Sequence, residues 1–359
     1  MSEKPLSDLR VVETAAILAG PAVGLFFAEL GARVTKVENK RAGGDVTRRW
    51  KLPSEDLDSP VSAYFSSVNW GKEHLLLDLQ DASDRERFDD LLREADVLIT
   101  NHLEEDAVKL GLDRERLREL NPNLVHGHIA GFSDQPERPA FDVVLQAETG
   151  FISMTGTDGK HLAKLPIALI DVLAAHQLKE GLLLALLQRS RTGRGSHVRV
   201  SLEEAALTGL INQASNQLMA GHTAGPLGTL HPNIAPYGEL FPCADGGLLI
   251  LAVGTDRQFT QLCEVLGLHE IPSDGRFTTN AERVRNRMAL AALLAPAIAK
   301  ARRDDLLDEL LQAGVPAGAV RDLAEVMQSP AARAMTLEST IDGQQTRRIR
   351  GNAFRIGPL

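Results

Sequence analysis

Residues 9–38 read LRVVETAAILAGPAVGLFFAELGARVTKVE, and this stretch decides the fold class. Arg10-Val11-Val12-Glu13 predicts a short strand, Pro21 to Leu30 a helix, and Arg33-Val34-Thr35-Lys36-Val37 a second strand. Gly31 stands where a glycine commonly ends a helix. Because a strand, a helix and a strand follow in this order, we expect a βαβ unit with parallel strands and a right-handed crossover.

The same alternation continues along the first half of the chain. Asp84–Ala95 is expected to be helical, and buried strands are expected at Asp96–Thr100 and Leu124–Ile129. A long apolar helix should then run from Asp171 to Arg189, before a strand at His197–Val200. Strands that alternate with helices predict an α/β fold with a parallel sheet covered on both faces.

The pattern changes in the second half of the chain. A helix from Glu203 to about Ala220 is followed by a polar stretch, rich in glycine and proline, at 221–236. Gly238–Cys243 and Leu248–Val253, joined by a short turn, predict a β-hairpin. Since further helices follow it, we expect a second, smaller α+β domain here.

Composition limits the partners that the protein can have. A length of 359 residues exceeds one compact core, and a net charge of −9 argues against a nucleic-acid partner. The longest apolar run, Gly181–Leu187, is far shorter than the roughly 20 residues of a membrane span, and no signal pattern opens the chain. Two cysteines and ten histidines without paired-ligand spacing predict no disulfide framework and no metal site. We therefore expect a cytoplasmic protein without membrane contact.

Two groups of residues are candidates for phosphate binding. Ala19–Gly24 follows the first strand but lacks the second glycine of a GxGxxG motif, so a nicotinamide cofactor is not expected. The better candidates are basic residues in the first 72 positions, several of which follow a predicted strand: Lys36, Lys40, Arg41, Arg48, Arg49 and Lys72. Ligands usually bind at the carboxyl ends of parallel strands, although solvated surface charge is the alternative for each residue.

Two aspartates on apolar segments are candidates for chemistry. Asp171 follows the apolar stretch Leu165–Ile170 and opens the long helix, so it could be a helix cap that accepts from the amides of Leu173 or Ala174. The same amides could also hold a reactive carboxylate. Asp142 allows a cap interpretation too. A serine or cysteine nucleophile is disfavoured, because no GxSxG occurs and neither cysteine has a local motif.

An ordered set of segments resembles one enzyme family. The set comprises Gly20-Pro21, Ala28–Ala32, Lys36–Glu38, Gly44–Arg48, Asn69–Lys72, Asn121–Val125, Phe141–Ala147, Thr192–Gly195, Pro236-Tyr237 and Ala244–Gly246. In this order, over about residues 6–330, the segments resemble the family III CoA-transferases (the CaiB/BaiF group). That family includes formyl-CoA:oxalate and carnitine CoA-transferases and shares its fold with α-methylacyl-CoA racemases.

The resemblance implies a domain organisation. It implies a large Rossmann-like, CoA-binding domain at residues 1–205, completed by 326–359, then a linker at 206–225 and a small α+β domain at 226–325. It also implies a homodimer whose two chains interlock as rings.

The resemblance further implies a reaction. The family moves CoA from an acyl-CoA donor to a carboxylic acid, with CoA as co-substrate and without metal or ATP. Its nucleophilic aspartate, here Asp171, forms an acyl–aspartyl anhydride and then an aspartyl-CoA thioester that the acceptor acid attacks. Asp142 is the second implied catalytic carboxylate. The implied CoA contacts are Ile17, Leu18, Asn39, Lys40, Arg41, Lys72 and Asn101.

Two other functions compete with CoA transfer. Racemases of this fold share a histidine just before the aspartate that aligns with Asp142. That histidine pairs with the later aspartate, so that protons can be transferred on both sides of the substrate. Here that position is Phe141, which favours transfer, although the chain length is closer to the racemases. A non-catalytic acyl-CoA-binding protein would bind without a covalent adduct. Leu18 replaces a glutamine of the formyl-CoA enzymes, which argues against formyl or oxalyl substrates.

Overall fold

The computed structural model describes residues 4–357, which fold into two compact units. The first unit comprises the chain up to Phe151, the segment Lys164–Thr223, and the chain from Ala331 onward. The second unit comprises Ile152–Ala163 and Ala224–Pro330. Each unit is therefore built from segments that are distant in the sequence.

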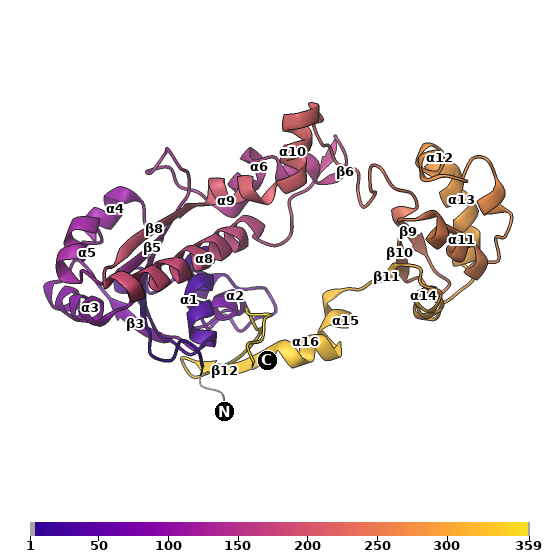
Figure 1. Ribbon diagram of the computed structural model, residues 1–359. Coiled ribbons are helices and arrows are strands. Elements are labelled where there is room, and N and C mark those ends of the chain that lie inside the picture. Colours follow the sequence, from indigo (N-terminus) through magenta and orange to yellow (C-terminus); the bar gives the residue numbers. More distant parts are fainter. Residues whose placement is uncertain (1–3, 358–359) are drawn as a thin grey trace. The chain divides into compact units, whose positions relative to one another are not determined.

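A six-stranded parallel sheet forms the centre of the first unit (Figure 1). Its strands are β1 (Arg10–Glu13), β2 (Arg33–Asn39), β3 (Glu73–Leu77), β4 (Val97–Thr100), β5 (Val125–Ala130) and β8 (Ser196–Ser201). They lie in the order β3-β2-β1-β4-β5-β8, and every neighbouring pair is parallel. This is the strand order of the doubly wound, dinucleotide-binding fold, so the predicted α/β class and parallel sheet are confirmed.

Helices account for most of the remaining first unit. They are α1 (Ala19–Glu29), α2 (Ala63–Val68), α3 (Ala82–Glu94), α4 (Glu104–Lys109), α5 (Arg114–Leu120), α6 (Asp142–Glu148), α8 (Leu169–Thr192), α9 (Leu202–Gly209), α10 (Ile211–Ala220) and α16 (Pro330–Met335), with 3-10 turns at Lys40–Ala42 and Val46–Arg49. Most of the segment 206–225, expected to be a linker, is helical, because α9 and α10 continue to Ala220. Within residues 4–357 no helix has the length and apolar character needed to cross a membrane.

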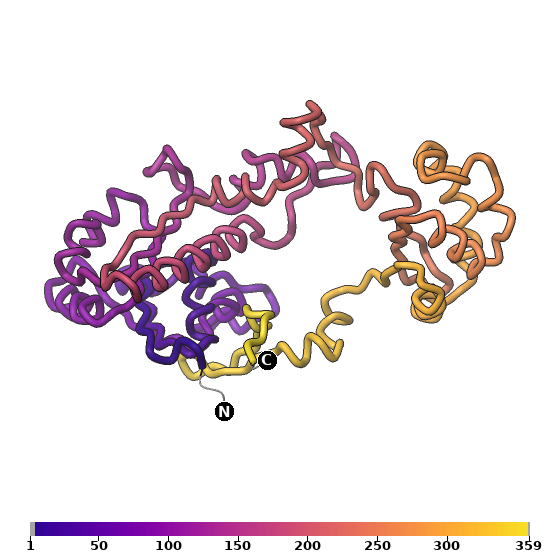
Figure 2. The backbone as a smooth tube through the Cα atoms, in the orientation of Figure 1, coloured from indigo at the N-terminus to yellow at the C-terminus, as the bar shows by residue number. Residues whose placement is uncertain are grey.

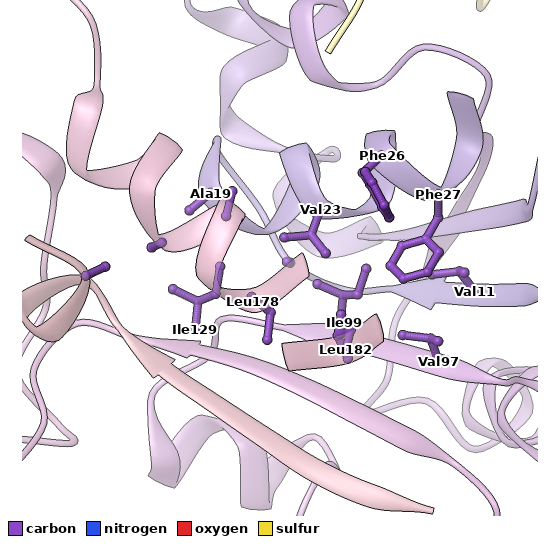
Figure 3. Close-up of a cluster of buried hydrophobic side chains, with 14 of the residues drawn as sticks. Val11, Ala19, Val23, Phe26, Phe27, Val97, Ile99, Ile129, Leu178 and Leu182 are labelled. Atoms are coloured by element: carbon purple, nitrogen blue, oxygen red, sulfur yellow. The ribbon is translucent and has the colours of Figure 1, made fainter. Parts of the chain in front are cut away.

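Both faces of the sheet are covered, and each has its own core. Figure 3 shows α1 and α8 on one face, where their side chains meet Val11, Val97, Ile99 and Ile129 of the strands. The other face packs against α3 and α5, whose Phe88, Leu92 and Leu117 contact a cluster that includes Val12, Val37 and Leu98. Because successive strand residues point to opposite faces, the neighbours Val11 and Val12 belong to different cores.

The C-terminal segment returns to the beginning of the chain. Figure 2 traces this segment, in yellow, back to the indigo N-terminal part, and it forms the antiparallel hairpin β12 (Thr336–Ile341) and β13 (Gln344–Ile349). Arg348 forms a buried ion pair with Glu29 at the end of α1. The amides of Gly351 and Asn352 donate to the same carboxylate at 2.7 and 3.0 Å. These contacts fix the last residues onto the first unit.

The second unit is a small α+β fold. Its antiparallel sheet has the order β11-β10-β9 and is formed by β9 (Tyr237–Pro242), β10 (Leu248–Ala252) and β11 (Ala317–Val320), with a separate pair β6 (Gly156–Asp158) and β7 (His161–Leu162). The predicted hairpin is therefore present as β9 and β10. The helices are α11 (Asp256–Val265), α12 (Asn280–Arg285), α13 (Arg287–Ile298), α14 (Arg303–Gln312) and α15 (Leu323–Met327), while α7 (Phe151–Met154) begins at the boundary and a 3-10 turn covers Ile271–Ser273.

Candidate active site

A cavity of about 480 Å³ lies at the carboxyl ends of β1, β2, β3 and β4. Its walls come from the loops after these strands and from α4, and include Thr14–Ile17, Glu38, Asn39, Leu77–Gln80, His102 and Lys109. The strand order reverses between β1 and β4, and ligands of doubly wound sheets bind in the crevice at that point. This cavity therefore lies where ligands of such folds usually bind, and we call it the substrate cavity.

The loop between β1 and α1 has an unusual conformation. Ile17 has a φ of 75°, a left-handed value that is strained for a β-branched side chain. Its amide donates to Oδ2 of Asp45 at 3.2 Å. Asn101 exchanges two hydrogen bonds with the backbone of Ala16, at 2.9 and 3.1 Å. Asn101, an implied CoA contact, thus positions this loop and is not among the residues that line the substrate cavity.

Four charged side chains are buried together beneath this loop. Glu13, Lys36, Asp45 and Lys72 each expose at most 1% of their side chains. The ammonium of Lys36 lies 3.1 Å from an oxygen of Glu13 and 3.1 Å from an oxygen of Asp45. It also donates to the carbonyl of Ala15 at 2.7 Å. Two cations thus face two carboxylates, which offsets part of the desolvation cost of burying them.

Lys72, an implied CoA contact, belongs to this buried network. Its ammonium donates to both oxygens of Glu13 at 2.8 and 2.9 Å, and to the side chain of Asn69 and the carbonyl of Pro21. Burial lowers its pKa to about 8. All four hydrogen bonds of the Lys72 ammonium are made to groups of the protein interior. Lys72 is not part of the cavity wall.

Three of the implied CoA contacts do line the substrate cavity: Ile17, Asn39 and Arg41. Asn39 accepts from the amide of Arg41 at 2.9 Å and so begins the 3-10 turn that follows β2. The guanidinium of Arg41 is held by Asp78 Oδ2 at 2.6 Å and by Gln80 at 2.5 Å. These contacts fix a cation at the rim where strands β2 and β3 end.

The other two implied contacts lie outside the cavity wall. The ammonium of Lys40 is largely exposed and lies 3.3 Å from Asp84 of α3. Leu18 is half-buried at the residue before α1. Neither residue is part of the cavity lining.

The cavity contains polar residues that the sequence did not indicate. His102 follows β4, donates to or accepts from Thr14 Oγ1 at 3.0 Å, and has its pKa lowered to about 4 by burial. Lys109 of α4 lies 3.1 Å from Asp106, and both line the cavity. The only feature of the sequence that could have indicated these residues is their position after the strand predicted at Asp96–Thr100, because ligand contacts are common after such strands.

Asp142 and Asp171 come together at the start of α8. The helix begins at Leu169, so Asp171 lies in its first turn, and the interpretation of Asp171 as the helix cap is wrong. The cap comes instead from Asp142, whose Oδ1 accepts from the Ile170 amide at 2.7 Å. Its other oxygen accepts from Gln146 Nε2 at 2.6 Å. Asp142 thereby fixes the end of the helix that carries Asp171.

The carboxylate of Asp171 has an unusual electrostatic environment. Burial raises its pKa to about 7, and the negative charge of Asp142 contributes to the rise. Among residues 4–357 no hydrogen bond or ion pair holds this carboxylate. A carboxylate that is poorly solvated and unpaired is a stronger nucleophile than one in water.

Tyr64 of α2 senses the charges of three carboxylates. Burial raises the pKa of Tyr64 to about 12, and the charges of Asp171, Asp142 and Asp45 add to the effect. The phenol therefore lies within electrostatic reach of both Asp171 and Asp45, which lines the cavity. The ring of Trp50 contacts that of Tyr64 edge-on at 5.1 Å.

In residues 4–357 no three His, Cys, Asp or Glu side chains are grouped as a metal ion would require.

Comparisons with known proteins agree on one family. The model of CoA-transferase family III matches residues 6–357. Succinate–glutarate CoA-transferase of Agrobacterium fabrum is 36% identical over 346 residues, covering 95% of this chain and 86% of that protein. Acetyl-CoA:oxalate CoA-transferase of Acetobacter aceti is 34% identical over 341 residues, covering 93% and 86%.

Solved structures give the same result. A CaiB/BaiF family protein from Brucella suis has a TM-score of 0.88 at 38% identity, covering 98% of this chain and 92% of that one. Rv3272 from Mycobacterium tuberculosis has a TM-score of 0.83 at 26% identity, covering 98% and 93%. The fold and the match along nearly the whole chain lead to one conclusion. This chain belongs to CoA-transferase family III.

Proposed function

We propose that this protein transfers CoA from an acyl-CoA donor to a small carboxylic acid, with Asp171 as the nucleophile. The observation that carries the proposal is the half-buried, unpaired carboxylate of Asp171, whose pKa is raised to about 7. Half of this group is ionised near neutral pH, so a reactive carboxylate is available where the enzyme works. The two relatives named above act on succinate, glutarate and oxalate, which indicates small acids as substrates.

The substrate cavity supports binding of the nucleotide part of CoA. Its volume of about 480 Å³ is within the range of about 300–1,000 Å³ that is typical of ligand sites. Arg41, Arg49 and Lys109 supply cations for phosphate groups, and Val37 and Leu79 supply apolar surface for the adenine ring. The carboxyl-end position and the charge of the lining thus both favour an anionic nucleotide.

The proposed reaction has two balanced halves. In the first, an oxygen of Asp171 attacks the thioester carbonyl, the C–S bond breaks, and CoA leaves as a thiolate from an acyl–aspartyl anhydride. The thiolate then attacks the aspartyl carbonyl, which releases the donor acid as a carboxylate and leaves an aspartyl-CoA thioester. No ATP is required, because the free energy of the donor thioester is conserved, first in the anhydride and then in the aspartyl-CoA thioester.

The second half reverses these steps with the acceptor acid. The acceptor carboxylate attacks the aspartyl-CoA thioester, giving a second anhydride and the thiolate. The thiolate attacks the acceptor carbonyl, forms the new acyl-CoA and frees Asp171.

Proton transfer of the racemase type has less support. The residue before Asp142 is Phe141, so an imidazole is absent from that position. Both oxygens of Asp142 accept hydrogen bonds from the protein. Asp142 is therefore a positioning residue in this proposal, and not an acid or base.

We also propose that the protein is a homodimer. Large apolar side chains on α8, α9 and α10 are exposed, including Leu184, Leu207, Ile211, Leu218 and Met219. Exposed apolar surface of this kind is typical of an interface with another chain. Light scattering after size exclusion should give twice the mass of 38.9 kDa, and a monomer would contradict the proposal.

A thioester-exchange assay tests the proposed function. Succinyl-CoA is incubated with glutarate, and mass spectrometry follows the appearance of glutaryl-CoA. Asp171→Asn should lower the rate more than about 1,000-fold, because it removes the group that forms the covalent intermediates. Glu180→Gln, which changes an exposed carboxylate of the same helix, should leave the rate unchanged.

Two outcomes would contradict the proposal. If Asp171→Asn turned over at the rate of the native enzyme, Asp171 would not be the nucleophile. If a 2-methylacyl-CoA exchanged its α-proton for deuterium while no thioester exchange occurred with any acid, the chain would be a racemase.

A further inference from the structure

A second cavity, of about 610 Å³, lies at the opposite edge of the same sheet. It is lined by α5, by the residues before and at the start of β5, and by the residues at the start of β8. Figure 1 labels these three elements in the first unit. These are the amino ends of the strands, whereas the substrate cavity lies at the carboxyl ends. No residue lines both cavities, so among residues 4–357 the two are separate sites.

The second cavity carries an excess of positive charge. Its lining contains three arginines, Arg114, Arg118 and Arg194, and one carboxylate, Glu115. Arg118 lies 4.0 Å from Glu115. In the part of the chain that the structure describes, the guanidinium groups of Arg114 and Arg194 have no ion-pair or hydrogen-bond partner. Two exposed arginines, Arg114 and Arg194, therefore bring unpaired guanidinium groups to one cavity.

Two buried polar atoms of the lining also lack partners. His126 is 8% exposed, and its Nδ1 is buried without a hydrogen bond. Ser196 Oγ is likewise buried without a hydrogen bond. Both residues line the second cavity. Because buried polar atoms are nearly always hydrogen-bonded, these two indicate a ligand or water that the cavity holds.

The Thr100 hydroxyl can fix the tautomer of a neutral His126 side chain. The Thr100 hydroxyl lies 2.9 Å from His126 Nε2 and 2.8 Å from His128 Nδ1. A hydroxyl donates one hydrogen bond and can accept others, so it can donate to His126 and accept from His128. In that arrangement His126 Nε2 accepts, and its Nδ1 carries an N–H that has no hydrogen-bond partner within the described residues.

We propose that the second cavity binds a phosphate group, separately from the substrate cavity. Guanidinium groups bind phosphate oxygens through charge-assisted, bidentate hydrogen bonds. The donors come from α5, from the turn before β8 and from the starts of β5 and β8. Donors from several segments suit a tetrahedral group with three terminal oxygens better than a planar carboxylate with two. The proposal does not depend on the chain being a CoA-transferase.

Titration calorimetry with inorganic phosphate tests this site directly. We expect one phosphate to bind the native protein. Arg114→Gln and Arg194→Gln should each weaken binding about tenfold or more, because each removes a charge-assisted hydrogen bond. Arg191→Gln, which changes an exposed arginine near the end of α8 outside this cavity, should have no effect.

A further variant excludes binding of phosphate in the substrate cavity. Arg41→Gln should leave unchanged the phosphate binding that depends on Arg114 and Arg194, because Arg41 lines only the substrate cavity of the two. If Arg41→Gln abolished binding while Arg114→Gln and Arg194→Gln did not, the proposal would be wrong. An absence of measurable phosphate binding to the native protein would overturn it as well.

Two other probes identify the source of the phosphate group. Glycerol 3-phosphate that binds more tightly than inorganic phosphate, with the same loss in Arg114→Gln, would identify a phosphorylated metabolite as the ligand. Weaker binding of this ester would identify free phosphate. Succinate that bound the site as tightly as phosphate would contradict the choice of a phosphate group.

Discussion

Replacing Asp171 by asparagine tests the electrostatic environment of this carboxylate through stability, without any substrate. Burial and the charge of Asp142 raise the pKa of Asp171 from 3.8 to about 7. Between these two values the folded protein keeps a proton that the unfolded chain releases. The free energy of unfolding of the native protein therefore falls as pH rises through this window, and it stays level above pH 7 with respect to this group.

Asparagine does not ionise, so Asp171→Asn should not show this loss. A rise of about three pH units at about 1.4 kcal/mol each sets an upper bound of about 4 kcal/mol for the stabilisation above pH 7. Urea unfolding at pH 5 and pH 8 measures the effect. The advantage of the variant over the native protein should grow by about 2–3 kcal/mol between these pH values.

The matched control is Glu180→Gln, which changes an exposed carboxylate on the same helix. Its difference in stability from the native protein should not depend on pH. An advantage of Asp171→Asn that is equal at pH 5 and pH 8, or absent at both, would refute the reasoning, because Asp171 would then titrate as it does in water.

Three further predictions concern the residues around the site. Asp142→Asn keeps an acceptor for the Ile170 amide but removes the negative charge that helps to raise the pKa of Asp171. The acidic limb of the pH–kcat/KM profile should therefore move below pH 7, but it should remain above the ordinary aspartate range because burial is the larger cause of the shift. An unmoved limb would contradict the electrostatic coupling of the two aspartates. Arg41→Gln should raise KM for acyl-CoA about tenfold with kcat nearly constant, as loss of one charge-assisted hydrogen bond predicts, and an unchanged KM in initial-rate assays would place CoA elsewhere. Lys72→Met should lower the free energy of unfolding by about 3 kcal/mol or more, because it breaks a buried ion network. It should not raise KM for acyl-CoA, and a raised KM would mean that Lys72 contacts CoA.

Local patterns in the sequence were sufficient to predict the central fold. The strands β1, β2, β4 and β5 alternate with helices, and each lies within two residues of its predicted place. By contrast, β3 lies at the edge of the sheet and exposes Leu76 by 52%, so it lacks the continuous apolar run of a central strand. The long helix was also predicted, although it begins two residues before Asp171.

The site was predictable only where chain order determines position. Asn39 and Arg41 line the substrate cavity because Asn39 ends β2 and Arg41 follows it, and the carboxyl end of a strand can be predicted from the sequence. The buried partnership of Lys72 with Glu13 depends on residues that are distant in the chain. It also requires Gly24 of α1, where a Cβ atom would lie 1.8 Å from a Glu13 oxygen. No local pattern encodes that contact.

The cap of α8 illustrates the same limit. Aspartate near the start of a helix is a common cap, and sequence spacing alone favoured that role for Asp171. The structure gives the role to Asp142, which precedes Ile170 by 28 residues and reaches the helix from α6. Asp171 is thereby left without a partner of its own.

Trapping the covalent intermediate is the most direct measurement of the central claim. The native enzyme is incubated with succinyl-CoA, quenched and digested, and the peptide that contains Asp171 is analysed by mass spectrometry. We predict a CoA adduct on Asp171 that hydroxylamine converts to the hydroxamate and that is missing from Asp171→Asn. Steady turnover without any adduct on this peptide, or an adduct on Asp142 in its place, would contradict the account.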